Sequence, residues 1–173
     1  MNTRRDEIYE SITKSELLFL FGISGLIGLI IFCICYGVQI LNVSNDRWLL
    51  QGGDLMSHYI GWKAYRNSPW QFPIGMIEGL TYPDQTCIIF TDSIPLFAIF
   101  FKLLSPVLPE TFQYFGIFGA LDFILMGGIA AVILRKGTMN KGICIVGSIF
   151  FSFSPYVLQR LYNHTALASH WLI

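Results

Sequence analysis

Long apolar runs alternate with polar segments along the chain, and the longest run lies near the N-terminus. Residues 17–41 form 25 consecutive positions without Asp, Glu, Lys, Arg or His. A helix rises about 1.5 Å per residue, so this run is long enough to cross roughly 30 Å of hydrocarbon. Two later apolar runs, 112–134 and 142–159, also fit a crossing. The sequence therefore predicts an all-α, polytopic transmembrane protein with about three crossings.

A shorter apolar segment, 94–109, lies between the first and second predicted crossings. It has only 16 residues, is bracketed by prolines and contains Lys102. Proline interrupts helical hydrogen bonding, and a full crossing needs about 20 mostly apolar residues. We therefore predict juxtamembrane or re-entrant helices here, within a loop that covers 42–111.

Basic residues gather at two places that this arrangement puts on one side of the membrane. They are Arg4, Arg5 and Lys14 before the first crossing, and Arg135, Lys136 and Lys141 between the second and third. Because cytoplasmic segments carry an excess of Lys and Arg, we predict a cytoplasmic tail at 1–16. The loop 42–111 and the start of a further loop at 160–173 are then external. The sequence ends within an apolar stretch, so we interpret 1–173 as the N-terminal part of one transmembrane domain.

The composition supports a membrane protein and excludes one class of partner. Hydrophobic residues make up 54% of the chain and charged residues 13%, against about 25% charged residues in soluble domains. The formal net charge is zero, and no basic block could neutralise a run of phosphates. The lipid bilayer is therefore an expected partner and nucleic acid is not.

The external loop collects side chains with chemical potential beside the membrane. Asp54, His58, Trp62 and Arg66 follow at helical spacing, on one face of a helix predicted at about 55–66. A carboxylate beside an imidazole can act as a general base or hold a divalent metal ion, which makes Asp54 and His58 metal candidates. An indole offers a face to a sugar ring, and a guanidinium can bind a phosphate.

Structural roles compete with these chemical ones. Asp54 could cap the short helix, and His58 could contact lipid headgroups. Asp92 precedes another helix, so we favour a capping role for it over a second acidic ligand. Asp122 lies inside the second predicted crossing, where an acidic side chain must be protonated, paired with another group or turned to the bundle interior.

A second polar group follows the third crossing. Arg160, His164 and His170 lie at its external end, where cationic or donor groups could meet a lipid phosphate. The two histidines are six residues apart, which differs from the i, i+4 spacing of a helical zinc pair. A self-contained metal site in this segment is therefore not expected.

Four strings of the sequence together resemble a bacterial family of uncharacterised polytopic membrane proteins. They are Gly53 to Trp62, Arg66 to Trp70, Phe90 to Leu96, and His164 to Trp171. That family in turn is similar to the C-type superfamily of membrane glycosyltransferases (GT-C) in its layout and in one acid of the first external loop. The likeness covers residues 17–173 and implies a multi-pass protein of the bacterial inner (plasma) membrane.

The resemblance implies that Asp54 acts as the catalytic base. A sugar would pass from a polyprenyl-phosphate donor to a cell-envelope acceptor, with or without a divalent metal ion. Residues that would contact the substrate are His58, Trp62, Arg66, Asp92, Arg160, His164 and His170. A second acid is usual in the later loop of the superfamily, where this chain has His164 and His170.

A different class of function remains open from the residues alone. An ionisable residue inside a crossing is typical of transporters, so Asp122 favours a non-enzymatic transporter or a lipid- or polysaccharide-handling protein. The enzyme hypothesis depends on Asp54, and the transporter hypothesis depends on Asp122.

Overall fold

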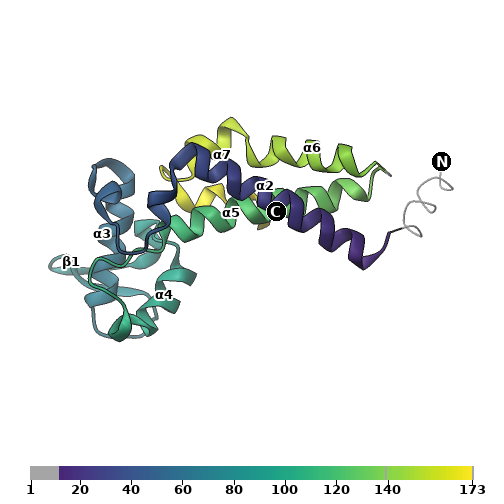
Figure 1. Ribbon diagram of the computed structural model, residues 1–173. Helices are drawn as coiled ribbons and strands as arrows, with labels where there is room; N and C mark the ends of the chain where they lie inside the picture. Colours follow the sequence, from purple (N-terminus) through teal and green to yellow (C-terminus); the bar gives the residue numbers. More distant parts are fainter. Residues whose placement is uncertain (1–11, 139, 173) are drawn as a thin grey trace. The chain divides into compact units, whose positions relative to one another are not determined.

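The computed structural model describes residues 12–138 and 140–172, apart from the side chain of His170, and these residues are mostly helical (Figure 1). Three helical stretches are long and apolar enough to cross a membrane. They are α2 (Lys14–Tyr36), α5 (Phe115–Arg135), and Lys141–Arg160, which comprises α6 (Lys141–Ser152) and α7 (Pro155–Arg160). Most of the predicted tail 1–16 lies outside the described residues.

The ends of α2 differ from the apolar run because local capping decides them. The Thr13 side chain accepts a hydrogen bond from the Glu16 N–H at 3.2 Å, so the helix begins before the first leucine of the run. Gly37 follows the last helical residue with φ +82°, a conformation that glycine adopts without strain. A 3₁₀ turn, Val38–Leu41, takes up the rest of the predicted crossing.

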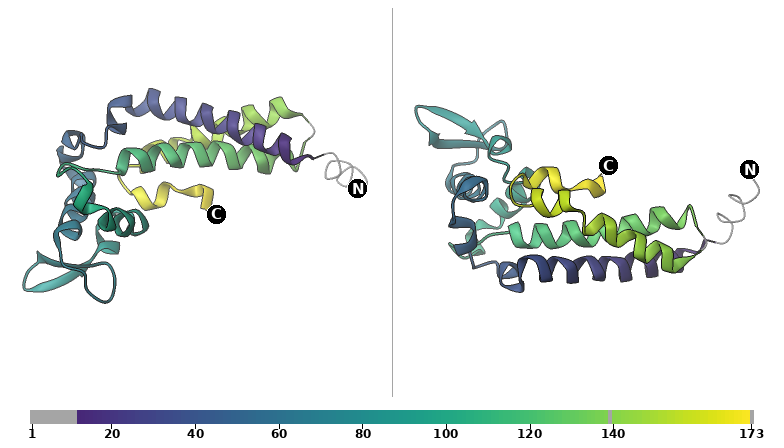
Figure 2. Two further views of the ribbon diagram at one scale, coloured as in Figure 1. Left: turned by 60° about the horizontal axis from the view of Figure 1, so that its bottom comes forward. Right: turned by 90° about the horizontal axis from the view of Figure 1, so that it is seen from above.

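The chain divides into two compact units, and the first holds the long helices. It comprises 1–38, 117–158 and 169–173. Small residues let its helices approach closely: a Cβ on Gly127 would stand 2.6 Å from the Ser24 carbonyl oxygen. The long helices run alongside one another (Figure 2). At one end, an ion pair joins α5 to α2, with Arg135 Nε 2.6 Å from Glu16 Oε1.

The second unit comprises 39–116 and 159–168 and includes the candidate site residues Asp54, His58 and Asp92. Its elements are α3 (Gly53–Asn67), β1 (Met76–Thr81), β2 (Asp84–Cys87), α4 (Pro95–Leu103), and short 3₁₀ turns at Arg47–Leu50, Ile88–Thr91, Ser105–Val107 and Thr165–Ala168. The two strands form an antiparallel hairpin with Met76 opposite Cys87 and Thr81 opposite Asp84. The all-α prediction missed this hairpin. Buried aromatic side chains, among them Trp62, Tyr65 and Tyr114, form much of the core of this unit.

Within this unit, the segment that follows α2 lies against the start of α5. The Gln113 side-chain amide donates to the carbonyl oxygens of Ile40 at 2.8 Å and Asn42 at 3.0 Å. A Cβ on Gly116 would overlap the Ile40 carbonyl oxygen, so this approach requires glycine. The helix α4 has nine residues, or about 14 Å of helix, which is half the length that a crossing needs.

Candidate polar site around His58

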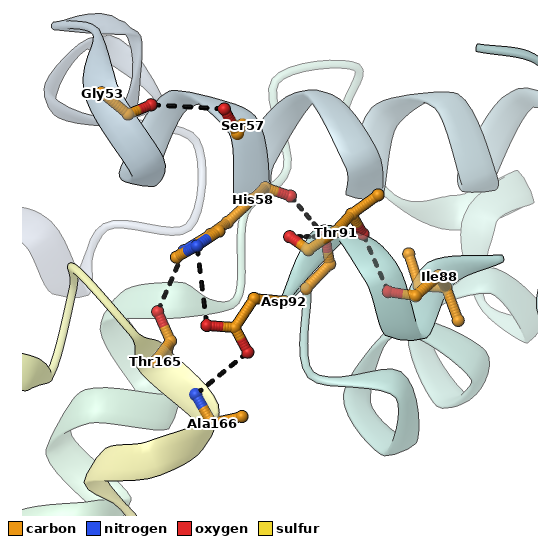
Figure 3. A network of polar contacts seen from close by, with 9 residues as sticks. Gly53, Ser57, His58, Ile88, Thr91, Asp92, Thr165 and Ala166 are labelled. Carbon is orange, nitrogen blue, oxygen red and sulfur yellow. Dashed lines mark hydrogen bonds and ion pairs between the residues drawn. The ribbon is translucent and has the colours of Figure 1, made fainter. Parts of the chain in front are cut away.

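His58 joins three segments of the second unit that are far apart in the sequence (Figure 3). It lies in α3 and is only 4% exposed. Its Nε2 is 3.6 Å from Asp92 Oδ2, and its Nδ1 is 3.1 Å from the Thr165 hydroxyl. The imidazole thus ties the helix α3 to the turn before α4 and to the turn Thr165–Ala168.

Asp92 takes part in this network instead of capping α4. Its backbone is left-handed with φ +50°, a conformation that aspartate tolerates better than most residues. One carboxylate oxygen faces His58, and the other accepts a hydrogen bond from the Ala166 N–H at 3.3 Å. The N-cap of α4 is Ile94, without a side-chain capping bond. The capping prediction for Asp92 is therefore wrong, while a role as a second acid stays a prediction.

The loop that carries Asp92 is fixed against α3 by short polar contacts. The Ser93 hydroxyl donates to the His58 carbonyl oxygen at 2.6 Å and lies 2.7 Å from the Thr91 hydroxyl. The Tyr114 hydroxyl donates to the Ser93 carbonyl oxygen. Gly61 makes this approach possible, because a Cβ there would stand 2.8 Å from Ser93 Oγ and closer still to Thr91. Asp92 is therefore held in one position.

Burial sets the protonation of His58. Desolvation lowers the pKa of this imidazole below its usual 6.5; the Asp92 and Asp54 carboxylates oppose the shift, and His164 adds to it. The ring is then neutral at pH 7. We assign the proton to Nε2, which faces Asp92, while Nδ1 accepts from the Thr165 hydroxyl.

The order carboxylate, imidazole, hydroxyl is also that of hydrolase triads. In such triads, however, the hydroxyl must reach a substrate. The Thr165 side chain is completely buried. The network therefore positions Asp92 and does not present Thr165 as a nucleophile.

Asp54 lies on the exposed side of the same region. It stands in the first turn of α3, whose N-cap is Gly52, so it does not cap the helix through its side chain. Asp54 is exposed, and its charge reaches His58. Two carboxylates, one exposed and one held in place, thus act on the same imidazole.

Trp62 and Arg66, also on α3, make contacts that hold the fold together. Trp62 is completely buried, and its Nε1 donates to the Phe112 carbonyl oxygen at 3.1 Å. The Arg66 guanidinium donates to the carbonyl oxygens of Ser105, Leu108, Pro109 and Glu110 at 2.7–3.4 Å. The first side chain belongs to the core, and the second holds the segment after α4.

Of the residues predicted to follow the third crossing, the structure brings only some to the site. Arg160 ends α7 and is half-buried. His164 is exposed and directly precedes Thr165, whose hydroxyl contacts His58. The side chain of His170 lies outside the described residues. Among the side chains that the structure describes, no group of three or more His, Cys, Asp or Glu residues could hold a metal ion.

A family model described as a domain of unknown function (DUF6311) matches residues 25–173. The chain belongs to this family. The match spans Asp54, His58, Asp92 and Thr165, so the whole network lies within the DUF6311 domain. No curated protein and no solved structure matches the chain.

Several members of the site in this DUF6311 domain carried no signal in the sequence. Thr165 is separated from His58 by 107 positions, and the hydroxyls of Thr91 and Ser93 lie in the string Phe90–Leu96, where only Asp92 was given a role. In the first unit, the partners of Asp122 were also unknown. Its carboxylate accepts hydrogen bonds from Ser169 Oγ at 2.8 Å and Trp171 Nε1 at 2.6 Å.

Proposed function

We propose that this domain belongs to a membrane glycosyltransferase, similar to the GT-C superfamily, that transfers a sugar from a polyprenyl-phosphate donor to a cell-envelope acceptor. One observation carries the proposal: the exposed carboxylate of Asp54 lies four residues before His58 on α3, and the Asp92 carboxylate is held 3.6 Å from the buried His58 imidazole. Paired carboxylates in different environments suit glycosyl chemistry, because one can remain an ionised base while the other binds.

Asp54 is the general base in this proposal. Its exposed carboxylate accepts the proton of the acceptor hydroxyl, whose oxygen forms the new bond to the anomeric carbon. The bond from the anomeric carbon to the donor phosphate oxygen breaks, and the polyprenyl phosphate leaves with the electron pair. Asp54 suits this step better than Asp92, whose two oxygens already face His58 and the Ala166 N–H.

Asp92 lies in the same predicted loop as Asp54 and would take the place of the second acid that the superfamily usually carries in a later loop, where this chain has His164 and His170. Its side chain is 30% exposed, so a sugar hydroxyl or a bound cation could still reach it. His58 is then a positioning residue, since it is buried and acts through Asp92. The left-handed backbone at Ile94, a β-branched residue that adopts this conformation only under strain, supports a functional role for the loop, because such strain gathers at active sites.

The leaving phosphate requires a cationic or donor partner. Arg66 is committed to four carbonyl oxygens, which makes it a poor candidate. His164 is exposed and directly precedes Thr165, which contacts His58, so we assign the phosphate contact to His164, with Arg160 as a second candidate.

Replacement of Asp54 tests the proposal. Membranes that contain the full-length protein are given radiolabelled polyprenyl-phosphate hexoses, and label in the acceptor fraction is counted. Asp54→Asn should abolish transfer with normal expression, because the amide cannot take the proton. Asp84→Asn, an exposed aspartate of the hairpin, serves as the matched control and should transfer at the wild-type rate. Equal transfer by Asp54→Asn and the control would end the proposal.

Transport is the second candidate function, and one observation favours it. Asp122 lies in α5, is 1% exposed and accepts hydrogen bonds from Ser169 and Trp171. Buried carboxylates within crossings often mark ion or substrate pathways. If Asp122→Asn abolished uptake or lipid flipping, and neither wild type nor Asp54→Asn transferred sugar, transport would replace the first proposal.

A further inference from the structure

The helix α4 and the 3₁₀ turn after it expose apolar side chains at helical spacing. These side chains are 39–81% exposed and are Leu96, Phe100, Leu103, Leu104 and Val107. Steps of three and four residues put them along one stripe of the segment. Soluble proteins rarely expose a contiguous apolar stripe of this kind without a partner.

The charged residue of this segment faces the opposite way. Lys102 is 4% exposed although it lies between Phe101 and Leu103. Its ammonium stands 4.0 Å from the ring centre of Tyr65 and 4.7 Å from that of Trp70. A helix in water would expose the lysine and bury the leucines. This inverted arrangement suits a surface in hydrocarbon, from which an ammonium must turn away.

Aromatic packing holds α4 against the residues at the start of α5. Phe97 and Phe101 of α4 pack on Tyr114, with ring centres 5.9 Å and 5.4 Å apart. Tyr114 in turn stacks on Phe115, the first residue of α5, at 4.7 Å. All four rings belong to the second unit. Within the second unit, α4 is thus held beside Phe115, the residue at which α5, a candidate crossing, begins.

We propose that the exposed face of α4 and its following turn contacts the acyl chains of the bilayer. The nine-residue helix is too short to cross, so it lies in the outer part of the hydrocarbon with Lys102 turned toward Tyr65 and Trp70. The inference does not depend on the enzymatic proposal, because any membrane protein with this unit would seat it in the same way.

Spin labelling in vesicles tests the contact with acyl chains. Single cysteines replace Leu96, Phe100 or Val107 in a full-length protein whose native cysteines, among them the four of 1–173, are changed to alanine. Each nitroxide-labelled variant is reconstituted in phosphatidylcholine and phosphatidylglycerol vesicles. Collision rates are measured with oxygen, which concentrates in hydrocarbon, and with a water-soluble nickel chelate. All three positions are exposed, so their labels should leave the fold intact.

The labels on α4 should collide with oxygen several-fold more often than with nickel. A label at Gln85, an exposed polar position in the hairpin, should show the reverse preference. Dominant nickel collisions at positions 96, 100 and 107 would place this face in water and overturn the inference. Low rates for both reagents, with an immobilised nitroxide spectrum, would show that protein covers the face and would overturn it as well.

Discussion

A methyl group added at Gly61 should disturb the site around His58 from a distance. Gly61 lies in α3 and faces Thr91 and Ser93, the neighbours of Asp92 in its loop. A Cβ at this position would stand 2.5 Å from Thr91 Oγ1 and 2.8 Å from Ser93 Oγ. Real Cβ atoms do not tolerate such approaches, so Gly61→Ala must push the loop away from α3.

The cost follows from three terms. Overpacking of a closely fitted contact costs about 1–3 kcal/mol. Separation of Ser93 from the His58 carbonyl oxygen, now joined at 2.6 Å, removes one buried hydrogen bond worth about 1 kcal/mol. Alanine gains about 1 kcal/mol over glycine within a helix. The net loss should be about 1–3 kcal/mol of unfolding free energy.

Reversible unfolding in mixed micelles, driven by SDS and followed by tryptophan fluorescence, measures this loss. Gly22→Ala is the matched control, because Gly22 also lies within a helix and a Cβ there would meet no atom within 4 Å. The control should unfold at or above the wild-type SDS concentration. If Gly61→Ala were as stable as this control, the close fit of the loop against α3 would be refuted.

Two further predictions concern the same unit. Burial lowers the pKa of His58 below 6.5, so the unfolded chain binds the proton more readily than the folded one; folding stability is therefore full above pH 6.5 and falls as the pH drops through the folded pKa. His58→Gln should flatten this decline in SDS titrations between pH 7.5 and 5.5. An unchanged slope would exclude His58 as the source of the decline. Arg66→Lys should lower the free energy of unfolding by about 1–3 kcal/mol, because an ammonium cannot bind all four carbonyl oxygens of 105–110. Arg47→Lys, at an exposed arginine, is the control. Equal stability of the two variants would contradict the role of Arg66.

The long helices could be predicted because uninterrupted apolar runs leave few alternatives. The run 17–41 gave the first helix to within three residues at its start, where Thr13 caps it, and five at its end, where Gly37 stops it. The hairpin at 76–87 was missed because neither of its strands alternates clearly between apolar and polar residues.

The site was predicted in part, and the part that was missed depends on tertiary contacts. Helical spacing placed Asp54 and His58 together, since both lie on α3. It also placed Trp62 and Arg66 on that face, but neighbouring segments cover this part of the helix and turn both residues into structural ones. The left-handed backbone of Asp92 and the contact of His58 with Thr165 depend on loops that no local pattern specifies.

Labelling with a membrane-impermeant maleimide tests most directly the central claim that Asp54 and the turn Thr165–Ala168 share one water-facing site outside the membrane. Single cysteines replace Asp54, Thr138 or Ala166 in the protein without its native cysteines and are probed in intact cells and after lysis. Positions 54 and 166 should react in intact cells, and position 138 only after lysis. Labelling of 54 and 166 from opposite compartments would contradict the shared site.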